Sequence, residues 1–343
     1  MDYKGKYAVF DPGKISTYPV SSRPSKVGLR DLVGPSDAEA LLIDLPQQTY
    51  AEVETVAEAV VCARRAGNPV VLFSGAHLIK NGLGPLLIEL VKRRMVTLVA
   101  GNAATAIHDF ELALVGATSE NVPEALGKGR FGMAREFAYI NAALCLGDEQ
   151  QLGIGESLGK MICEQEFREA VLGRVAQEDW PHQFEHPEVS VLAACYRNDV
   201  PFTVHAGIGT DVTDQHPSFD GRAKGGCSAR DFLIYANQIA DLTGGGVVLN
   251  IGSAVTGPEV LLKAAAMAAN VGRAPRNIVT ADFDMREYRP EAMSDEDCEG
   301  YYFRDQKSIV TRIPQAFAGK GIYVQGNQKQ TFPLLYRMIT EKA

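Results

Sequence analysis

The residues best suited to chemistry stand directly after short apolar segments. His108, Asp109 and Glu111 open an expected helix that follows the apolar segment 95–100. An imidazole beside two carboxylates can transfer a proton or orient an amine. The same carboxylates can instead only complement the positive end of the helix. Both interpretations stay open at this stage.

Two further groups of residues are candidates for the same chemistry. Asp211 and Asp214 stand three positions apart, and Lys80 follows an earlier apolar segment. A carboxylate can bind an ammonium group or accept its proton. A buried lysine can form an imine with a carbonyl substrate, whereas a lysine in water only solubilises the surface. We therefore retain Asp214 and Lys80 as candidate catalytic residues.

Other catalytic patterns are missing from the sequence. The chain has no HExxH pair, and its HxxxH pair, His182 and His186, is bracketed by prolines that disfavour a regular helix face. We expect no metal site and keep a metal-dependent hydrolase only as a weak alternative. The absence of a GxSxG turn also argues against a serine hydrolase.

Alternating short apolar and amphipathic segments must position these residues. This alternation is typical of βαβ units and predicts an α/β fold with a doubly wound parallel sheet. The expected strands are 69–73, 95–100, 201–206, 247–251, 277–281 and 321–324, and the expected helices are 51–66, 82–94, 104–115, 189–197, 229–240, 258–270 and 332–339.

Small and polar residues follow most of the expected strands. In open parallel sheets, ligands bind beyond the carboxyl ends of the strands, where main-chain N–H groups can approach a phosphate. The pattern therefore predicts a nucleotide site. The usual dinucleotide fingerprint is absent, however, because the glycines at 153, 155 and 159 have the wrong spacing and follow no clear strand. We interpret that segment as the entry to a helix.

The chain divides into two regions of different character. Five prolines interrupt residues 1–50, which predicts an irregular N-terminal arm. No linker interrupts residues 51–343, so we expect a single α/β domain there. A division into two domains near 150–185 is the alternative.

Composition excludes several classes of protein. Among 343 residues, 34 are Lys or Arg and 42 are Asp or Glu, which gives a formal charge of −8 and disfavours nucleic-acid binding. No apolar stretch approaches the roughly 20 residues that span a bilayer, and the N-terminus has no signal-peptide pattern. Six scattered cysteines without a CxxC pair are typical of a reducing compartment, so we expect a cytoplasmic protein.

Three stretches of the sequence resemble the deoxyhypusine synthase superfamily: 73–82 with 95–104, then 244–248, and 331–335. Within that superfamily, the segments 101–103, 107–111, 198–202 and 206–208 are similar to the archaeal-type ornithine cyclodeaminase group. That group is often described as lysine-ketoglutarate reductase/saccharopine dehydrogenase-like.

The resemblance implies a Rossmann-like fold, bound NAD and a homo-oligomer, a tetramer or a dimer. It also implies a small cationic amine or amino acid as substrate, whose C–N centre is transiently oxidised to an imine. His108, Asp109, Glu111 and Asp214 then become candidates for amine recognition or proton transfer. The cofactor contacts that the resemblance implies are Ser74, Gly75, Ala76, Gly101, Asn102, Ala103, Gly245, Gly246, Thr280, Ala281 and Asp282.

One departure from the deoxyhypusine synthases limits the resemblance. The lysine that forms their enzyme–imine intermediate is replaced here by Arg312, which stays protonated and cannot form an imine. We therefore expect no transfer of an aminobutyl group to a protein. An NAD-binding regulatory protein that has lost catalysis is the main alternative to an NAD-dependent enzyme.

Overall fold

A parallel six-stranded sheet forms the centre of the computed structural model, which describes residues 3–175 and 180–343. Its spatial order is β5-β3-β2-β6-β7-β8. Numbered along the chain, these strands run 3-2-1-4-5-6, the order of dinucleotide-binding Rossmann folds. The predicted α/β class with a doubly wound sheet is confirmed. The strands are β2 (Val70–Ser74), β3 (Leu98–Gly101), β5 (Phe202–Val204), β6 (Val247–Ile251), β7 (Val279–Asp284) and β8 (Lys320–Gln325).

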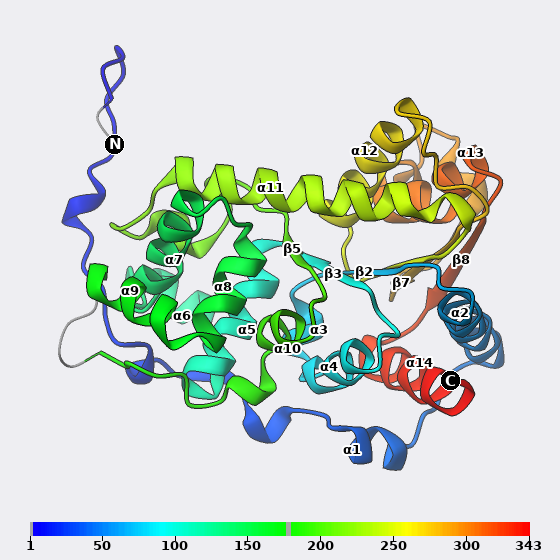
Figure 1. Ribbon diagram of the computed structural model, residues 1–343, viewed down its shortest axis with the longest axis horizontal. Helices are drawn as coiled ribbons and strands as arrows, with labels where there is room; N and C mark the ends of the chain where they lie inside the picture. Colours follow the sequence, from blue (N-terminus) through cyan, green and yellow to red (C-terminus); the bar gives the residue numbers. More distant parts are fainter. Residues whose placement is uncertain (1–2, 176–179) are drawn as a thin grey trace.

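Helices cover both faces of the sheet (Figure 1). On one face, α11 (Gly221–Ala240), α12 (Thr256–Asn270) and α13 (Ile313–Ala316) pack on side chains such as Phe73 and Val248. On the other face lie α2 (Gln47–Arg65), α4 (Gly84–Lys92) and α14 (Gln328–Lys342). Because successive strand residues point to opposite faces, strands covered on both sides are mainly apolar, with buried polar exceptions such as Asn250 and Asp282.

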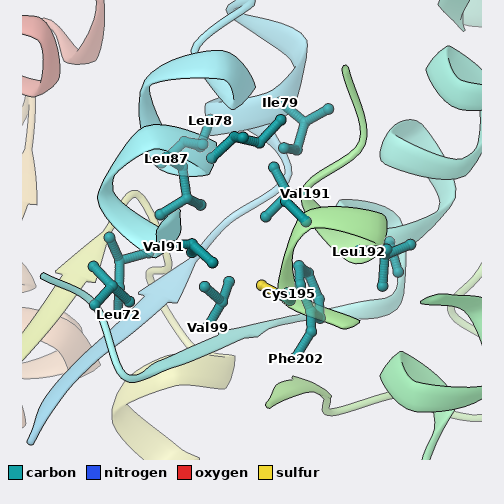
Figure 2. Packing of buried hydrophobic residues seen from close by; sticks show 14 of the residues in the cluster. Leu72, Leu78, Ile79, Leu87, Val91, Val99, Val191, Leu192, Cys195 and Phe202 are labelled. Carbon is teal, nitrogen blue, oxygen red and sulfur yellow. The ribbon is translucent and has the colours of Figure 1, made fainter. Parts of the chain in front are cut away.

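The remaining helices gather beyond the β5 edge of the sheet. They are α5 (Ala103–Val115), α6 (Val122–Gly127), α7 (Phe137–Glu149), α8 (Ile154–Cys163), α9 (Gln165–Val175) and α10 (Val191–Arg197). Apart from α6, which buries no residue, their apolar side chains join one continuous core with the sheet. Figure 2 shows Cys195 of α10 beside Val99 of β3 and Phe202 of β5, with Val191 of the same helix towards Leu87 of α4.

The boundaries of several expected helices differ from the structure, and two of these differences have a clear local cause. The expected helix 82–94 is α4, preceded by a separate turn, α3 (His77–Lys80), because Gly82 adopts a φ of 75° and ends that turn. The expected helix 229–240 begins earlier, at Gly221, because the Asp220 carboxylate accepts the N–H groups of Arg222 and Ala223.

Part of the expected irregular arm is built into the body. β1 (Ser25–Gly28) pairs antiparallel with β4 (Ala117–Glu120), and the Val20 N–H donates to the Glu136 carboxylate at 2.8 Å. A short helix, α1 (Pro35–Ala40), follows. The segment nearest the N-terminus extends away from the body (Figure 1), and residues 1–2 of the arm lie outside the described residues.

Among residues 3–175 and 180–343, no helix is both long enough and apolar enough to cross a membrane.

Candidate active site

Two adjoining cavities lie where the carboxyl ends of the sheet strands predict a ligand. The larger has a volume of about 790 Å³ and is bounded by the ends of β3 and β5 and by α11 and α12. The smaller, of about 450 Å³, lies among α3, α5 and β4. Ala104, Thr210 and Asp211 line both cavities. Two ligands bound side by side would therefore meet at these three residues.

The walls of the larger cavity fit a dinucleotide. Gly207 and Ile208 bring main chain to its surface, and Thr256 stands at the start of α12, where the Ser253 hydroxyl accepts the N–H of Gly257. The partial positive charge of a helix N-terminus favours a phosphate. Asn102 follows β3 and caps α5, its Oδ1 accepting from the Thr105 N–H, which leaves its amide N–H groups as donors. The residues that line this cavity do not follow the glycine spacing of the usual dinucleotide-binding fingerprint, so a search of the sequence for that fingerprint does not find the site.

His205 forms an uncharged aromatic part of the larger cavity. Its ring stacks on Phe73 at a centroid distance of 5.5 Å, and Tyr235 meets it edge-on at 5.2 Å. Burial lowers the pKa of His205 to about 3, so the imidazole is neutral at physiological pH. A flat, neutral surface of this kind suits a planar ring better than a charged group.

The end of β2 supports the site without lining either cavity. The Gly75 N–H donates to the Ile251 carbonyl at 2.9 Å, and a Cβ on Gly75 would lie 2.1 Å from the Gly252 oxygen. Only glycine allows these two strand ends to approach so closely. Ser74 is buried and bonds to the Gly75 carbonyl, and Ala76 leads into α3.

The other expected cofactor contacts fall in different places. Gly101 ends β3, and Ala103 starts α5 beside Asn102. Thr280, Ala281 and Asp282 lie inside β7 and are fully buried. The Thr280 hydroxyl donates to the Ile309 carbonyl, and Asp282 accepts from the Asn250 amide, which assigns both to internal bonding.

Gly245 and Gly246 lie away from the other expected cofactor contacts. They precede β6 and therefore lie at the amino ends of the strands, at the edge opposite Asn102. Both adopt positive φ angles, 103° and 132°, which suits a turn into a strand. The structure does not bring them together with the carboxyl-end residues, because parallel strands separate their two ends by the full strand length.

The smaller cavity carries unpaired positive charge. Lys26 and Lys80 line it and form no ion pair with any described residue. Burial, followed by the charges of Lys80 and His108, lowers the pKa of His77. The smaller cavity, in which we expected amine recognition, is therefore also suited to an anionic group such as a carboxylate.

A buried network joins His108 and Glu111 within the smaller cavity. The Thr118 Oγ1 lies 2.7 Å from the His108 Nδ1 and donates to the Glu111 Oε2 at 2.5 Å. The Arg23 guanidinium lies 2.7 Å from the other Glu111 oxygen and 3.6 Å from Glu120. Glu111 thus has a resident cation and does not need a substrate amine as its partner. Arg23, which the sequence analysis did not single out, comes from the expected arm.

Asp109 has a different position from His108 and Glu111. It points away from both cavities and caps α10, accepting from the Ser190 hydroxyl at 2.6 Å and from the main-chain N–H of Val191 and Leu192 at 2.7 and 3.1 Å. Burial raises its pKa to about 6 despite these hydrogen bonds. Successive residues of an α-helix are rotated by about 100° about its axis, so Asp109 and His108 point in different directions.

Asp214 is also paired internally. The buried Lys224 ammonium contacts the carboxylates of both Asp211 and Asp214, the former at 2.7 Å. Asp214 also accepts from the Gly209 N–H at 2.7 Å. Asp211 is the carboxylate of this pair that lines both cavities, and burial raises its pKa. The sequence grouped Asp211 with Asp214 but did not show that Asp211 alone of the two lines the cavities.

Two expectations concern metal and imine chemistry. Within the described part of the chain, no three His, Cys, Asp or Glu side chains are arranged to hold a metal ion. Arg312 is exposed at the end of the π-helix Gln306–Arg312, outside the residues that line the two cavities.

Comparisons with known proteins give likenesses of fold. No family model and no curated protein matches the chain. Solved structures do: AgrE in complex with ornithine and NAD+ (16% identity, TM-score 0.48, 88% of this chain and 34% of that one), and the arginine dihydrolase ArgZ of cyanobacteria (16%, 0.46, 86% and 32%). A protein of Entamoeba histolytica named as a deoxyhypusine synthase matches at 10% identity with a TM-score of 0.46, covering 95% and 97%.

The chain thus spans about a third of the length of AgrE and ArgZ. At these identities and TM-scores, the comparisons concern the arrangement of elements only. The two cavities themselves are the features of this chain that indicate a function.

Proposed function

We propose that this protein is an NAD-dependent enzyme that oxidises the C–N centre of a small amino acid to an imine. The observation that carries the proposal is the junction of two cavities at the carboxyl edge of a sheet with Rossmann order. The larger cavity would hold the dinucleotide, and the smaller would hold the substrate. Their shared wall at Ala104, Thr210 and Asp211 would set the reacting carbon beside the cofactor.

The charges of the smaller cavity favour an amino acid over a simple amine. Lys80 and Lys26 offer unpaired ammonium groups to a substrate carboxylate. Asp211 and Asp214 share the single Lys224 ammonium, so this group keeps a net negative charge, and Asp211 presents that charge to a substrate ammonium at the boundary of the cavities. A polyamine would meet the lysines with like charge, which costs binding energy. Ornithine-like substrates are therefore favoured over their decarboxylated counterparts.

The reaction balances with one hydride and one proton. A nicotinamide held in the larger cavity would supply the acceptor for the hydride of the carbon that carries the amine. The substrate ammonium must first lose a proton, and His108 is an imidazole of the smaller cavity placed to accept it. The products are an iminium group on the substrate and a protonated base. Lys80 fixes the carboxylate during this step, and Asp211 stabilises the positive charge that remains on nitrogen.

Titration calorimetry with NAD and NADP tests the cofactor part of the proposal. We expect micromolar binding of at least one dinucleotide. Ala229→Trp, which fills the larger cavity, should abolish binding, whereas Ala266→Trp on the exposed side of α12 should leave it unchanged. Absence of binding by the wild-type protein would overturn the proposal.

Reduction of the bound dinucleotide, followed by absorbance, tests the chemistry. We expect absorbance to rise with ornithine or lysine and to stay flat with putrescine or agmatine. Tight dinucleotide binding without absorbance change across amino acids and amines would instead support the regulatory alternative, which the loss of the imine-forming lysine at Arg312 favours.

A further inference from the structure

We infer that Thr118 is a positioning residue that holds His108 in the tautomer protonated on Nδ1, so that Nε2 is the atom that accepts the substrate proton. This inference rests on the proposed function for the identity of the proton donor. The tautomer itself is a property of the unliganded chain. It follows from the hydrogen bonds around one buried hydroxyl group.

The Thr118 hydroxyl has two polar neighbours. Its Oγ1 lies 2.7 Å from the His108 Nδ1 and 2.5 Å from the Glu111 Oε2, and the side chain is fully buried. A hydroxyl group carries one hydrogen atom, so it can donate to only one of these two neighbours. The direction of the other bond is then fixed by which neighbour receives that hydrogen.

Glu111 is the neighbour that must accept. Although burial raises the pKa of Glu111, the hydrogen bond from His108, the charges of Arg23 and His108 and the hydrogen bond from Thr118 outweigh this effect and lower it overall. The Arg23 guanidinium lies 2.7 Å from Oε1. An ionised carboxylate only accepts hydrogen bonds, so Thr118 donates to Glu111. Thr118 must therefore accept from His108, and the proton of the neutral imidazole stands on Nδ1.

The consequence is a lone pair on the Nε2 of His108. A neutral imidazole with hydrogen on Nδ1 has an acceptor at Nε2, and no described residue bonds to that atom. His108 lines the smaller cavity and keeps 18% of its side chain exposed. In many active sites a third group orients the imidazole that acts as base. Here the Thr118 hydroxyl is that group, and the Glu111 carboxylate in turn orients the hydroxyl.

The antiparallel pair β1–β4 builds this arrangement. Val27 of β1 stands opposite Thr118 of β4, and Arg23 lies two residues before β1. The N-terminal segment thereby delivers the cation that keeps Glu111 ionised, while β4 delivers the hydroxyl. His108 and Glu111 lie on one face of α5, three residues apart.

Nitrogen-15 NMR of the histidine side chains tests the inference without any need for activity. At a pH where His108 is neutral, we expect the protonated-nitrogen signal on Nδ1, with the resonance assigned by its loss in His108→Gln. Thr118→Ser should retain this tautomer, and Thr118→Val should convert His108 to the Nε2–H form. A wild-type His108 with its hydrogen on Nε2 would overturn the inference whatever the enzyme does.

Turnover provides the second measurement. Thr118→Val should lower kcat by about tenfold or more with little change in KM, since positioning of a general base contributes to the chemical step. Thr118→Ser should restore most of the loss. Equal kcat for the wild-type and valine proteins would contradict the positioning role. A protein without turnover but with the expected tautomer would contradict only the proposed function.

Discussion

At the residue scale, charge pairing decides which side chains are free to meet a ligand. Glu111 and Asp214 are both carboxylates of the expected amine site, yet each has a buried cation beside it, Arg23 and Lys224. A paired carboxylate gains little from a second cation, because the first already compensates its desolvation. Lys80, by contrast, has no carboxylate partner among the described residues. Charged side chains without an ion-pair partner, such as Lys80, therefore indicate the charge of the substrate better than the paired carboxylates do.

Substitution of Lys80 should therefore weaken substrate binding. Lys80→Met removes a charged hydrogen-bond donor from the smaller cavity, an interaction that contributes about 1.5–3 kcal/mol. We expect KM for the amino acid to rise by about tenfold or more, with kcat changed much less. Lys320→Met, at an exposed position on β8, is the matched control. A KM unchanged by Lys80→Met would remove the lysine from substrate recognition.

Asp109 should influence stability and not turnover. Because burial raises its pKa to about 6, the folded state binds a proton more tightly than the unfolded state. The free energy of unfolding, relative to that of Asp109→Asn, should then fall by up to about 3 kcal/mol between pH 4 and pH 7. Denaturant titrations of both proteins across this range measure the difference. A difference independent of pH, or loss of turnover in folded Asp109→Asn protein, would contradict this assignment.

At the element scale, the closeness of the β2 and β6 ends shapes the site. The tight contact of Gly75 with the Gly252 carbonyl sets the position at which α3 leaves the sheet, and α3 carries both His77 and Lys80. The 3-2-1-4-5-6 order places its switch point between these same strands. Gly75, whose position has no room for a Cβ, therefore lies at the switch point of the sheet.

Gly75→Ala should disturb this junction. The added Cβ would lie 2.1 Å from main-chain oxygen, which cannot move like a flexible side chain. We expect a loss of about 1–3 kcal/mol in the free energy of unfolding, together with weaker dinucleotide binding. Gly173→Ala, in α9 with open space around it, should instead stabilise by about 0.5–1 kcal/mol. Unfolding by denaturant compares the two, and equal stability of Gly75→Ala and wild type would contradict the packing argument.

At the scale of the whole molecule, one apolar core connects the sheet with the helices beyond β5. Leu72 and Val99 of the sheet belong to the same buried cluster as Phe110 of α5 and Leu158 of α8. Shared burial of this kind couples the unfolding of the two regions. We therefore propose that residues 51–343 form a single domain and not two domains divided near 150–185.

Thermal unfolding should show one transition. Trp180, the only tryptophan, packs on Tyr139 of the helical region at a centroid distance of 5.5 Å, so its fluorescence reports on that region. Far-ultraviolet circular dichroism reports on the whole chain. We expect the two melting curves to coincide. Separate midpoints would show that the helices beyond β5 unfold independently of the sheet.

The sequence alone was sufficient for the fold class and for most elements of the sheet. β6 matches the expected strand 247–251, and the expected helix 104–115 differs from α5 by one residue, because buried strands and amphipathic helices leave periodic apolar patterns. Residues 116–185 have no such clear pattern apart from the glycine-rich helix entry at Gly153, which the structure places at the start of α8.

Only the tertiary structure decided which polar residues share a cavity. His108 and Asp109 are neighbours in sequence, yet one lines the smaller cavity and the other caps α10, because the helix turns by about 100° per residue. Arg23 reaches Glu111 from 88 positions away, and Lys224 contacts both Asp211 and Asp214 across a loop. Sequence periodicity records which residues are buried along one element, whereas ion pairs between elements depend on how those elements meet in space.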